Sequence, residues 1–286
     1  TAFIRRPQRW IQALSAGSRV GRVITAAPNF AYEWTAQRGL PGPGEDIDLR
    51  NVVMIIGSEP VSLDAMEAFT AAFGPYGLAP TAFKPSYGIA EATLFIATIA
   101  PDAKPTVVHL DPEHLATGRA VRVTADARDG VPVVSCGQVA RSEWAVVVDP
   151  ASGAELPDGE VGEFWLHGKN IGRGYWGRPE ETRRTFGATL ASRLGQGSHA
   201  EGTPAGATWL RTGDLGFYLD GELYVTGRMA DLIVIDGRQY YPQDIEATAA
   251  QASPAVRRGY VAAFTVPRDG QETLVIVSER APGTSR

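Results

Sequence analysis

Short runs of β-branched and other apolar residues alternate with helical patterns over the first hundred residues. This alternation predicts strands joined by crossover helices in a mainly parallel sheet. The clearest strand is Val52–Ile56, which is apolar throughout and predicts a fully buried parallel strand ending at Gly57. A helix is predicted next, with Ser62 as its N-cap. Its apolar positions recur at helical spacing: Leu63, Met66, Phe69 and Phe73.

A second helix is predicted to begin within "YGIAEATLFIATIA", after a short extended segment at residues 81–83. Glu91 is the one charged residue among the seventeen between Lys84 and Asp102. A carboxylate near the buried end of an apolar helix costs free energy unless a cation, a metal or hydrogen-bond donors meet it. The neighbouring sequence offers no such partner. Four residues supply the predicted apolar surface: Ile89, Leu94, Phe95 and Ile96.

From about Val107 the pattern changes to short strands separated by turn residues, which predicts a small antiparallel sheet or barrel. Asp220-Gly221 stands between two apolar segments and predicts a β-hairpin. After Arg228 come a strand, a helix beginning at Pro242 and two more strands. The predicted fold class is therefore α/β. It combines a parallel sheet and helices, an antiparallel β-barrel-like subdomain, and the start of a smaller α+β unit.

Composition and charge exclude several function classes. The 286 residues are 44% hydrophobic, which is enough for a buried core. The net charge of -5 argues against a nucleic-acid partner, because phosphate binding needs clustered Lys and Arg. Cys136 is the single cysteine, so no internal disulfide is possible, and the four scattered histidines have no zinc-ligand spacing. No apolar run reaches the roughly 20 residues of a membrane-spanning helix. We expect a cytoplasmic protein without stable membrane insertion.

Three short motifs carry candidate chemistry, and each also has an ordinary structural explanation. In "SYGIAEAT", Gly88 permits a tight turn and Glu91 suits the first turn of a helix. In "RTGD", Asp214 is either a turn residue or an acceptor for two vicinal hydroxyls, as a ribose presents them. Arg228 either forms a surface ion pair or holds a phosphate or ribose oxygen.

The order of six segments resembles the adenylate-forming enzyme superfamily, which joins a carboxylic acid to AMP. The details "PNFAYE", "YGIAEATLF" and "GRQYYPQDIEA" resemble its fatty-acyl-AMP ligase family. The stretch beginning "GYWGRPEETRRTFGATL" resembles the actinobacterial members that activate long meromycolic acid chains. The resemblance covers nearly the whole chain. In order, the six segments are "APNFAYEW", "GSEP", "SYGIAEAT", "GEFWLHGKNIGRGYW", "WLRTGDLGF" and "GRMADLIVIDGRQYYPQDIEA".

This resemblance implies ATP and Mg2+ as cofactors, and it assigns roles to the first motif. Tyr87 is expected to stack along the adenine, and Glu91 to help hold Mg2+ against the ATP phosphates. Ser86 and Gly88 belong to the same nucleotide-binding motif. Ala90 replaces the threonine that precedes the glutamate in most of the superfamily, a replacement that is common among fatty-acyl-AMP ligases.

The other site residues are implied in the same way. The loop of Gly57, Ser58 and Glu59 is expected to meet the adenine. Asp214 is expected to grip the ribose hydroxyls, and Arg228 to reach the ribose or a phosphate. Together with Glu91, these two form the expected catalytic set. The remaining implied positions are the acyl-pocket wall, Asn29 and Phe30, and the hinge, Ala230 and Asp231.

The resemblance also implies a division of the chain and a set of partners. Residues 1–229 are expected to belong to the large adenylation domain, with the family's insertion at about 106–135, and residues 230–286 to begin the small mobile domain. The implied partners are a long-chain fatty acid, the acyl carrier domain of a polyketide synthase, and the small C-terminal domain in cis. Transfer to a carrier rather than to CoA is what the insertion implies.

The chain is expected to be a fragment, with a phosphate loop upstream and a catalytic lysine downstream. By itself it is therefore expected not to adenylate a fatty acid. Two alternatives stay open at this stage: an acyl-CoA ligase, and a non-catalytic nucleotide-binding module.

Overall fold

The N-terminal part builds a five-stranded sheet in the order β1-β2-β3-β4-β8. The computed structural model describes residues 2–235, 237–268 and 271–284. β1, β2 and β3 run parallel, whereas β4 pairs antiparallel with β3 and with β8. The predicted parallel sheet is therefore confirmed, with an antiparallel edge. Its strands are β1 (Val23–Ala27), β2 (Val52–Ile56), β3 (Phe83–Tyr87), β4 (Ala97–Thr98) and β8 (Gln138–Val139).

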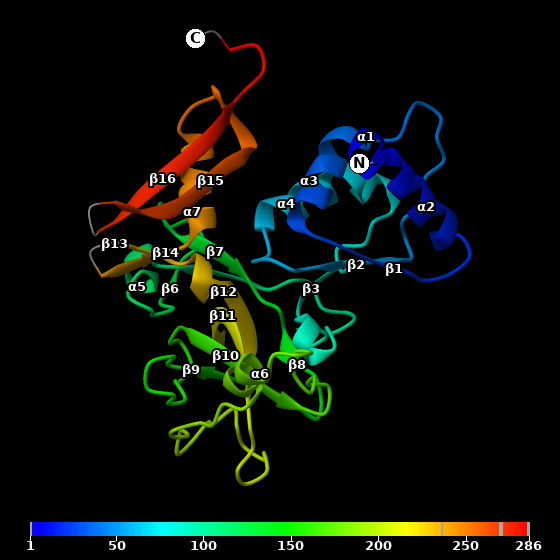
Figure 1. Ribbon diagram of the computed structural model, residues 1–286. Coiled ribbons are helices and arrows are strands. Elements are labelled where there is room, and N and C mark those ends of the chain that lie inside the picture. Colours follow the sequence, from blue (N-terminus) through cyan, green and yellow to red (C-terminus); the bar gives the residue numbers. More distant parts are fainter. Residues whose placement is uncertain (1, 236, 269–270, 285–286) are drawn as a thin grey trace.

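Helices cover one face of this sheet, as Figure 1 shows for α1 to α4 beside β1–β3. Met54 of β2 packs there with Tyr32 and Phe69 in one hydrophobic cluster. Val53 and Ile55, which point to the other face, are only half-buried, so the prediction of a fully buried strand is wrong for that face. The helices are α1 (Ala2–Arg5), α2 (Gln8–Ser18), α3 (Asn29–Arg38), α4 (Leu63–Phe73) and the 3-10 helix η1 (Gly74–Tyr76).

The N-cap prediction for α4 is confirmed, because the Ser62 hydroxyl accepts a hydrogen bond from the Ala65 N–H at 3.1 Å. The prediction of a second helix after β3 is wrong. Residues 88–96 form a tight turn that contains only a single 3-10 turn, η2 (Ala90–Ala92), before β4 begins. Thr93 and Leu94 both adopt left-handed backbone conformations, with φ of 54° and 81°.

The reason for this turn lies in backbone packing. A Cβ on Gly88 would lie 1.5 Å from the Leu94 carbonyl oxygen, so the chain folds back onto Gly88 itself. Leu94 is 70% exposed and Phe95 47%, whereas Ile96 is buried. The apolar residues of this segment therefore do not share one helical face, and their composition alone misled the prediction.

The middle of the chain forms two antiparallel sheets, β12-β11-β10-β9 and β6-β5-β7. The predicted hairpin at Asp220-Gly221 is confirmed, and both residues have positive φ, as a two-residue hairpin turn requires. Within the described residues these sheets stay open, so the expected barrel is not formed. The elements are β5 (Val107–Leu110), α5 (Pro112–Leu115), β6 (Arg122–Val123), β7 (Val131–Val134), β9 (Glu143–Val148), β10 (Gly162–Gly168), α6 (Pro179–Phe186), β11 (Leu210–Leu219) and β12 (Glu222–Arg228).

The C-terminal part contains two strand pairs and one helix that begins at Pro242, as predicted. The Gln239 N–H donates a hydrogen bond to the Ala116 carbonyl at 2.9 Å, which joins this part to the sheet formed by residues 107–134. No helix of the described chain has the length and apolar character needed to cross a membrane. The elements are η3 (Met229–Asp231), β13 (Ile233–Ile235), β14 (Arg238–Tyr240), α7 (Pro242–Gln251), β15 (Val256–Arg268) and β16 (Gln271–Arg280).

The close approach at Gly88 makes a sharp prediction. We expect Gly88→Ala to lower the free energy of unfolding of the chain by at least about 3 kcal/mol, because backbone rather than a movable side chain occupies the space. Urea denaturation followed by circular dichroism measures this change. Gly195→Ala is the control, since no atom lies within 4 Å of its added Cβ. Equal stability of the two variants would contradict the described turn.

Candidate functional site

A cavity of about 400 Å³ lies where the loop after β2, the turn after β3, the middle of β11 and the end of β12 come together. It brings together nine predicted site residues from four separate segments: Ser58, Glu59, Ser86, Tyr87, Gly88, Ala90, Glu91, Asp214 and Arg228. Sequence reasoning missed six further lining residues: Pro60, Ile89, Leu94, Cys136, Val225 and Gly227. Gly57 is not one of the lining residues; it packs against the Ser86 carbonyl.

Asp214 is the most highly connected carboxylate of the cavity and is only 6% exposed. It accepts a hydrogen bond from the Tyr87 hydroxyl at 2.8 Å and one from Arg228 Nε at 2.9 Å. Burial, and then the nearby Asp214 charge, raise the pKa of Tyr87 well above its ordinary value, so this hydroxyl stays protonated and donates. Arg228 compensates the carboxylate charge, and the Asp214 bond raises the pKa of Arg228.

The buried carboxylate of Glu163, on β10, holds the part of strand β11 that carries Asp214. It accepts hydrogen bonds from Arg211 at 2.9 and 3.1 Å, from Trp165 Nε1 at 2.8 Å, and from the Gly213 N–H at 3.0 Å. These four bonds satisfy a side chain in a residue that is 1% exposed. A charged residue in the apolar stretch "GEFWL" was the signal in the sequence, although two of its partners, Arg211 and Gly213, lie about fifty residues further along.

Glu91 has a partner that its neighbouring sequence did not reveal. The Tyr175 hydroxyl donates a hydrogen bond to Glu91 Oε1 at 2.7 Å, across 84 residues of sequence. Burial, followed by the Glu91 hydrogen bond, raises the pKa of Tyr175 to about 12, so the hydroxyl is protonated at neutral pH. The neighbouring sequence offers no partner for this carboxylate, but a distant segment of the folded chain supplies one.

The Glu91 carboxylate suits a magnesium ion that is bound together with a nucleotide. Among the described residues, no group of three or more His, Cys, Asp or Glu side chains is placed to hold a metal. Mg2+ is usually bound through one or two carboxylates together with phosphate oxygens and water, rather than in an all-protein cage. Glu91, with Oε1 bonded to Tyr175, leaves Oε2 to serve as such a ligand.

The loop after β2 is held in a defined conformation. Ser58 has a φ of 72°, a left-handed value that is uncommon for a residue with a side chain and is concentrated at ligand-binding loops. Glu59 accepts a hydrogen bond from the Asn29 N–H at 2.8 Å, and burial raises the pKa of Glu59. Asn29 Nδ2 in turn donates to the Pro60 carbonyl at 2.8 Å. Phe30, the other expected acyl-pocket residue, is 55% exposed and does not line this cavity.

The expected hinge residues follow directly after Arg228. Ala230 and Asp231 lie in η3, between β12 and β13, and both are exposed. Their assignment as a hinge, and the domain division at that point, remain predictions.

Comparison with known families identifies the chain. The family described as AMP-binding enzyme matches residues 6–176, which is more than half of the sequence. The chain belongs to this family. It is 49% identical over its whole length to the long-chain-fatty-acid–AMP ligase FadD32 of Mycolicibacterium smegmatis and 50% identical to FadD32 of Mycobacterium marinum. In both cases it covers 49% of the relative, so the chain spans about half the length of the curated relatives it matches.

Solved structures of adenylate ligases share the fold of this chain. A fatty acyl-adenylate ligase structure from work on the E. coli and L. pneumophila enzymes superposes with a TM-score of 0.80 at 29% identity, covering 98% of this chain and 46% of that one. The L. pneumophila enzyme in complex with acyl adenylate and pyrophosphate gives a TM-score of 0.71 at 32% identity, with the same coverage. The adenylate-forming fold predicted from the sequence is therefore confirmed.

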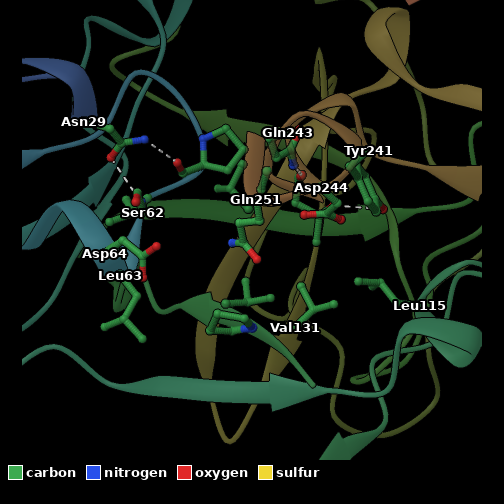
Figure 2. Close-up of a pocket in the computed structure, with 17 residues that line it drawn as sticks. Asn29, Ser62, Leu63, Asp64, Leu115, Val131, Tyr241, Gln243, Asp244 and Gln251 are labelled. Carbon is green, nitrogen blue, oxygen red and sulfur yellow. Dashed lines mark hydrogen bonds between the residues drawn. The ribbon is translucent and has the colours of Figure 1, made fainter. Parts of the chain in front are cut away.

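A second cavity of about 380 Å³ separates α7 from the N-terminal part of the chain. Figure 2 shows Asn29 and Asp64 on one side of it and Gln243 and Asp244 of the α7 segment on the other. Burial raises the pKa of the Asp244 carboxyl to about 6. The cavity therefore contains an acid that gains its proton more readily in the folded chain than in the unfolded one.

This raised pKa predicts a pH-dependent stability. An unfolded Asp ionises near pH 4, whereas the folded chain keeps the Asp244 proton up to about pH 6. Binding of this proton stabilises the folded state at low pH, and the stabilisation is lost as pH rises from about 4 through 6. We expect Asp244→Asn to be more stable than the wild type at pH 7, by up to about 3 kcal/mol, with the difference shrinking towards pH 4.

Urea denaturation of both proteins from pH 4 to 8 measures this difference. Asp129→Asn, which removes one exposed carboxylate, is the control for net charge. A stability difference between wild type and Asp244→Asn that is constant with pH would contradict the raised pKa.

Proposed function

We propose that the full-length protein containing this chain is a long-chain fatty-acyl-AMP ligase. It would convert a fatty acid and ATP into acyl-AMP and pyrophosphate. The acyl group would then pass to the acyl carrier domain of a polyketide synthase in mycolic-type lipid synthesis, in the cytoplasm. The observation that carries the proposal is one cavity in which Tyr87, Glu91, Asp214 and Arg228 meet. The identity of about half to the two FadD32 ligases supports the choice of substrate.

The proposed chemical step needs little proton transfer. An oxygen of the fatty-acid carboxylate attacks the α-phosphorus and forms a new O–P bond. The bond from that phosphorus to the oxygen bridging to the β-phosphate breaks, and pyrophosphate leaves with the electron pair. Because both the nucleophile and the leaving group are anions, the protein contributes orientation and charge stabilisation rather than a general base.

The residues of the cavity divide these tasks. Asp214 would accept hydrogen bonds from the two ribose hydroxyls. Arg228, which is bonded to Asp214, would contribute positive charge near the ribose and the phosphates. The loop of Ser58 and Glu59 would contact the adenine through its backbone. Glu91 would hold Mg2+, which neutralises charge on the phosphates when bound.

An acyl-CoA ligase is the rival function. The chain is 42% identical to a Mycobacterium tuberculosis relative that carries the name putative fatty-acid–CoA ligase fadD25, covering 97% of this chain and 45% of the relative. Against this rival, residues 106–135 would be the insertion that disfavours CoA, and they contain the sheet of β5, β6 and β7. Product analysis separates the two functions.

The full-length protein, given ATP, Mg2+ and a radiolabelled long-chain fatty acid, is expected to accumulate acyl-AMP. Adding CoA should leave acyl-AMP as the main product, as resolved by thin-layer chromatography. Acyl-CoA as the main product would replace the proposal with the rival function.

A matched pair of aspartates in the β11–β12 hairpin tests the role of Asp214. We expect Asp214→Asn in the full-length protein to raise the KM for ATP by roughly 10- to 100-fold, because hydrogen bonds to a charged acceptor contribute about 1.5–3 kcal/mol. Asp220→Asn is the control, since Asp220 lies at the hairpin turn and pairs with Arg122 on the surface. Similar KM values for both variants would remove Asp214 from the ribose site.

A further inference from the structure

We infer that Tyr175 is a positioning residue that orients Glu91 for metal binding, and that residues 170–175 act as a clamp on the turn carrying Glu91. This inference rests on the proposed function, since it assigns a role to a group that supports the Mg2+ ligand. It concerns a residue to which neither the sequence motifs nor the composition of the cavity gave a role.

The clamp holds the turn through three short hydrogen bonds, two to backbone carbonyls of the turn and one from the Thr93 side chain. The Gly172 N–H donates to the Glu91 carbonyl at 2.7 Å. Asn170 Nδ2 donates to the Ala92 carbonyl at 2.9 Å, and the Thr93 hydroxyl donates to the Asn170 carbonyl at 2.6 Å. Bonds therefore run in both directions between two segments that are about eighty residues apart in sequence.

The turn needs such support. Thr93 and Leu94 are consecutive residues in left-handed conformations, and Leu94 is largely exposed, so its side chain adds little packing. Conformations of this kind persist when the surrounding structure determines them. The hydrogen bonds of the clamp hold the turn in this conformation on the side that carries Glu91.

The fourth contact, from Tyr175, reaches the side chain of Glu91 rather than the rest of the turn. The Tyr175 hydroxyl binds Glu91 Oε1 at 2.7 Å, which fixes the rotation of the carboxylate and leaves Oε2 for a cation. Because the tyrosine hydroxyl is neutral, it orients the carboxylate without compensating its charge. An Arg or Lys donor would compensate that charge. Hydrogen-bond partners of metal-ligating carboxylates commonly tune metal affinity by 10- to 100-fold.

Tyr175 is itself held in place by α6. Its backbone N–H donates to the Thr182 hydroxyl at 2.9 Å. Its ring packs edge-on against Phe186, with 5.2 Å between the ring centroids. The hydroxyl is therefore presented to Glu91 from a fixed ring, so removing the oxygen alone should leave the packing unchanged.

The test uses Mn2+ as the probe, bound to the full-length protein together with a non-hydrolysable α,β-methylene analogue of ATP. Electron paramagnetic resonance measures free Mn2+ and hence its dissociation constant. We expect Tyr175→Phe to raise that constant by about 10-fold, with an unchanged melting temperature and an unchanged KM for the fatty acid. Thr182→Val, which removes the support of Tyr175, should shift the constant in the same direction by less.

Two comparison variants make every outcome decisive. Tyr260→Phe removes a hydroxyl on β15, outside the cavity, and should bind Mn2+ like the wild type. Glu91→Gln should bind Mn2+ more weakly than any other variant. If Glu91→Gln weakens Mn2+ binding and Tyr175→Phe does not, the positioning role is overturned and the proposed function stands. If Glu91→Gln does not weaken it, Glu91 is not the metal ligand, and both the assigned metal role and the inference fail whatever the result for Tyr175→Phe.

Discussion

The buried carboxylate of Asp214 is the interaction on which the arrangement of the cavity depends. It joins Tyr87, at the end of the parallel sheet, to Arg228, at the end of the antiparallel one, across 127 residues of sequence on the Tyr87 side. A carboxylate in this position is tolerated only while donors and a cation surround it. Glu163, which accepts a hydrogen bond from Gly213 beside Asp214 on β11, is satisfied in the same way. Polar hydrogen bonds therefore hold the two sheets against each other, in addition to apolar packing.

The two carboxylates proposed for the site, Asp214 and Glu91, meet partners of different charge. Asp214 pairs with a guanidinium, so its negative charge is largely compensated and it suits neutral hydroxyl donors. Glu91 is bonded to a neutral tyrosine, so it keeps its charge and suits a cation. Two residues of the same chemical class thereby differ in how far their charge is compensated, according to the partners that each one meets.

Local chemistry explains which parts of the fold could be predicted from the sequence. The Ser62 cap, the Asp220-Gly221 hairpin and the helix start at Pro242 all depend on residues within one turn of each other. The turn after β3 and the Tyr175 contact depend instead on groups that meet only in the folded chain. An apolar composition suggested a helix where backbone contacts impose a turn. The positions of the site residues came from resemblance to a family, because no single motif distinguished a nucleotide site from an ordinary turn.

The contact between Gly88 and the Leu94 carbonyl gives positions 88 and 91 of one short motif different meanings. No side chain can be added at position 88 without moving backbone, so a glycine there records the path of the chain whatever the chain binds. Glu91, three residues later, is under no such steric demand. When related sequences are compared, a change at position 88 therefore signals a rebuilt loop, whereas a change at position 91 within an intact loop signals altered chemistry.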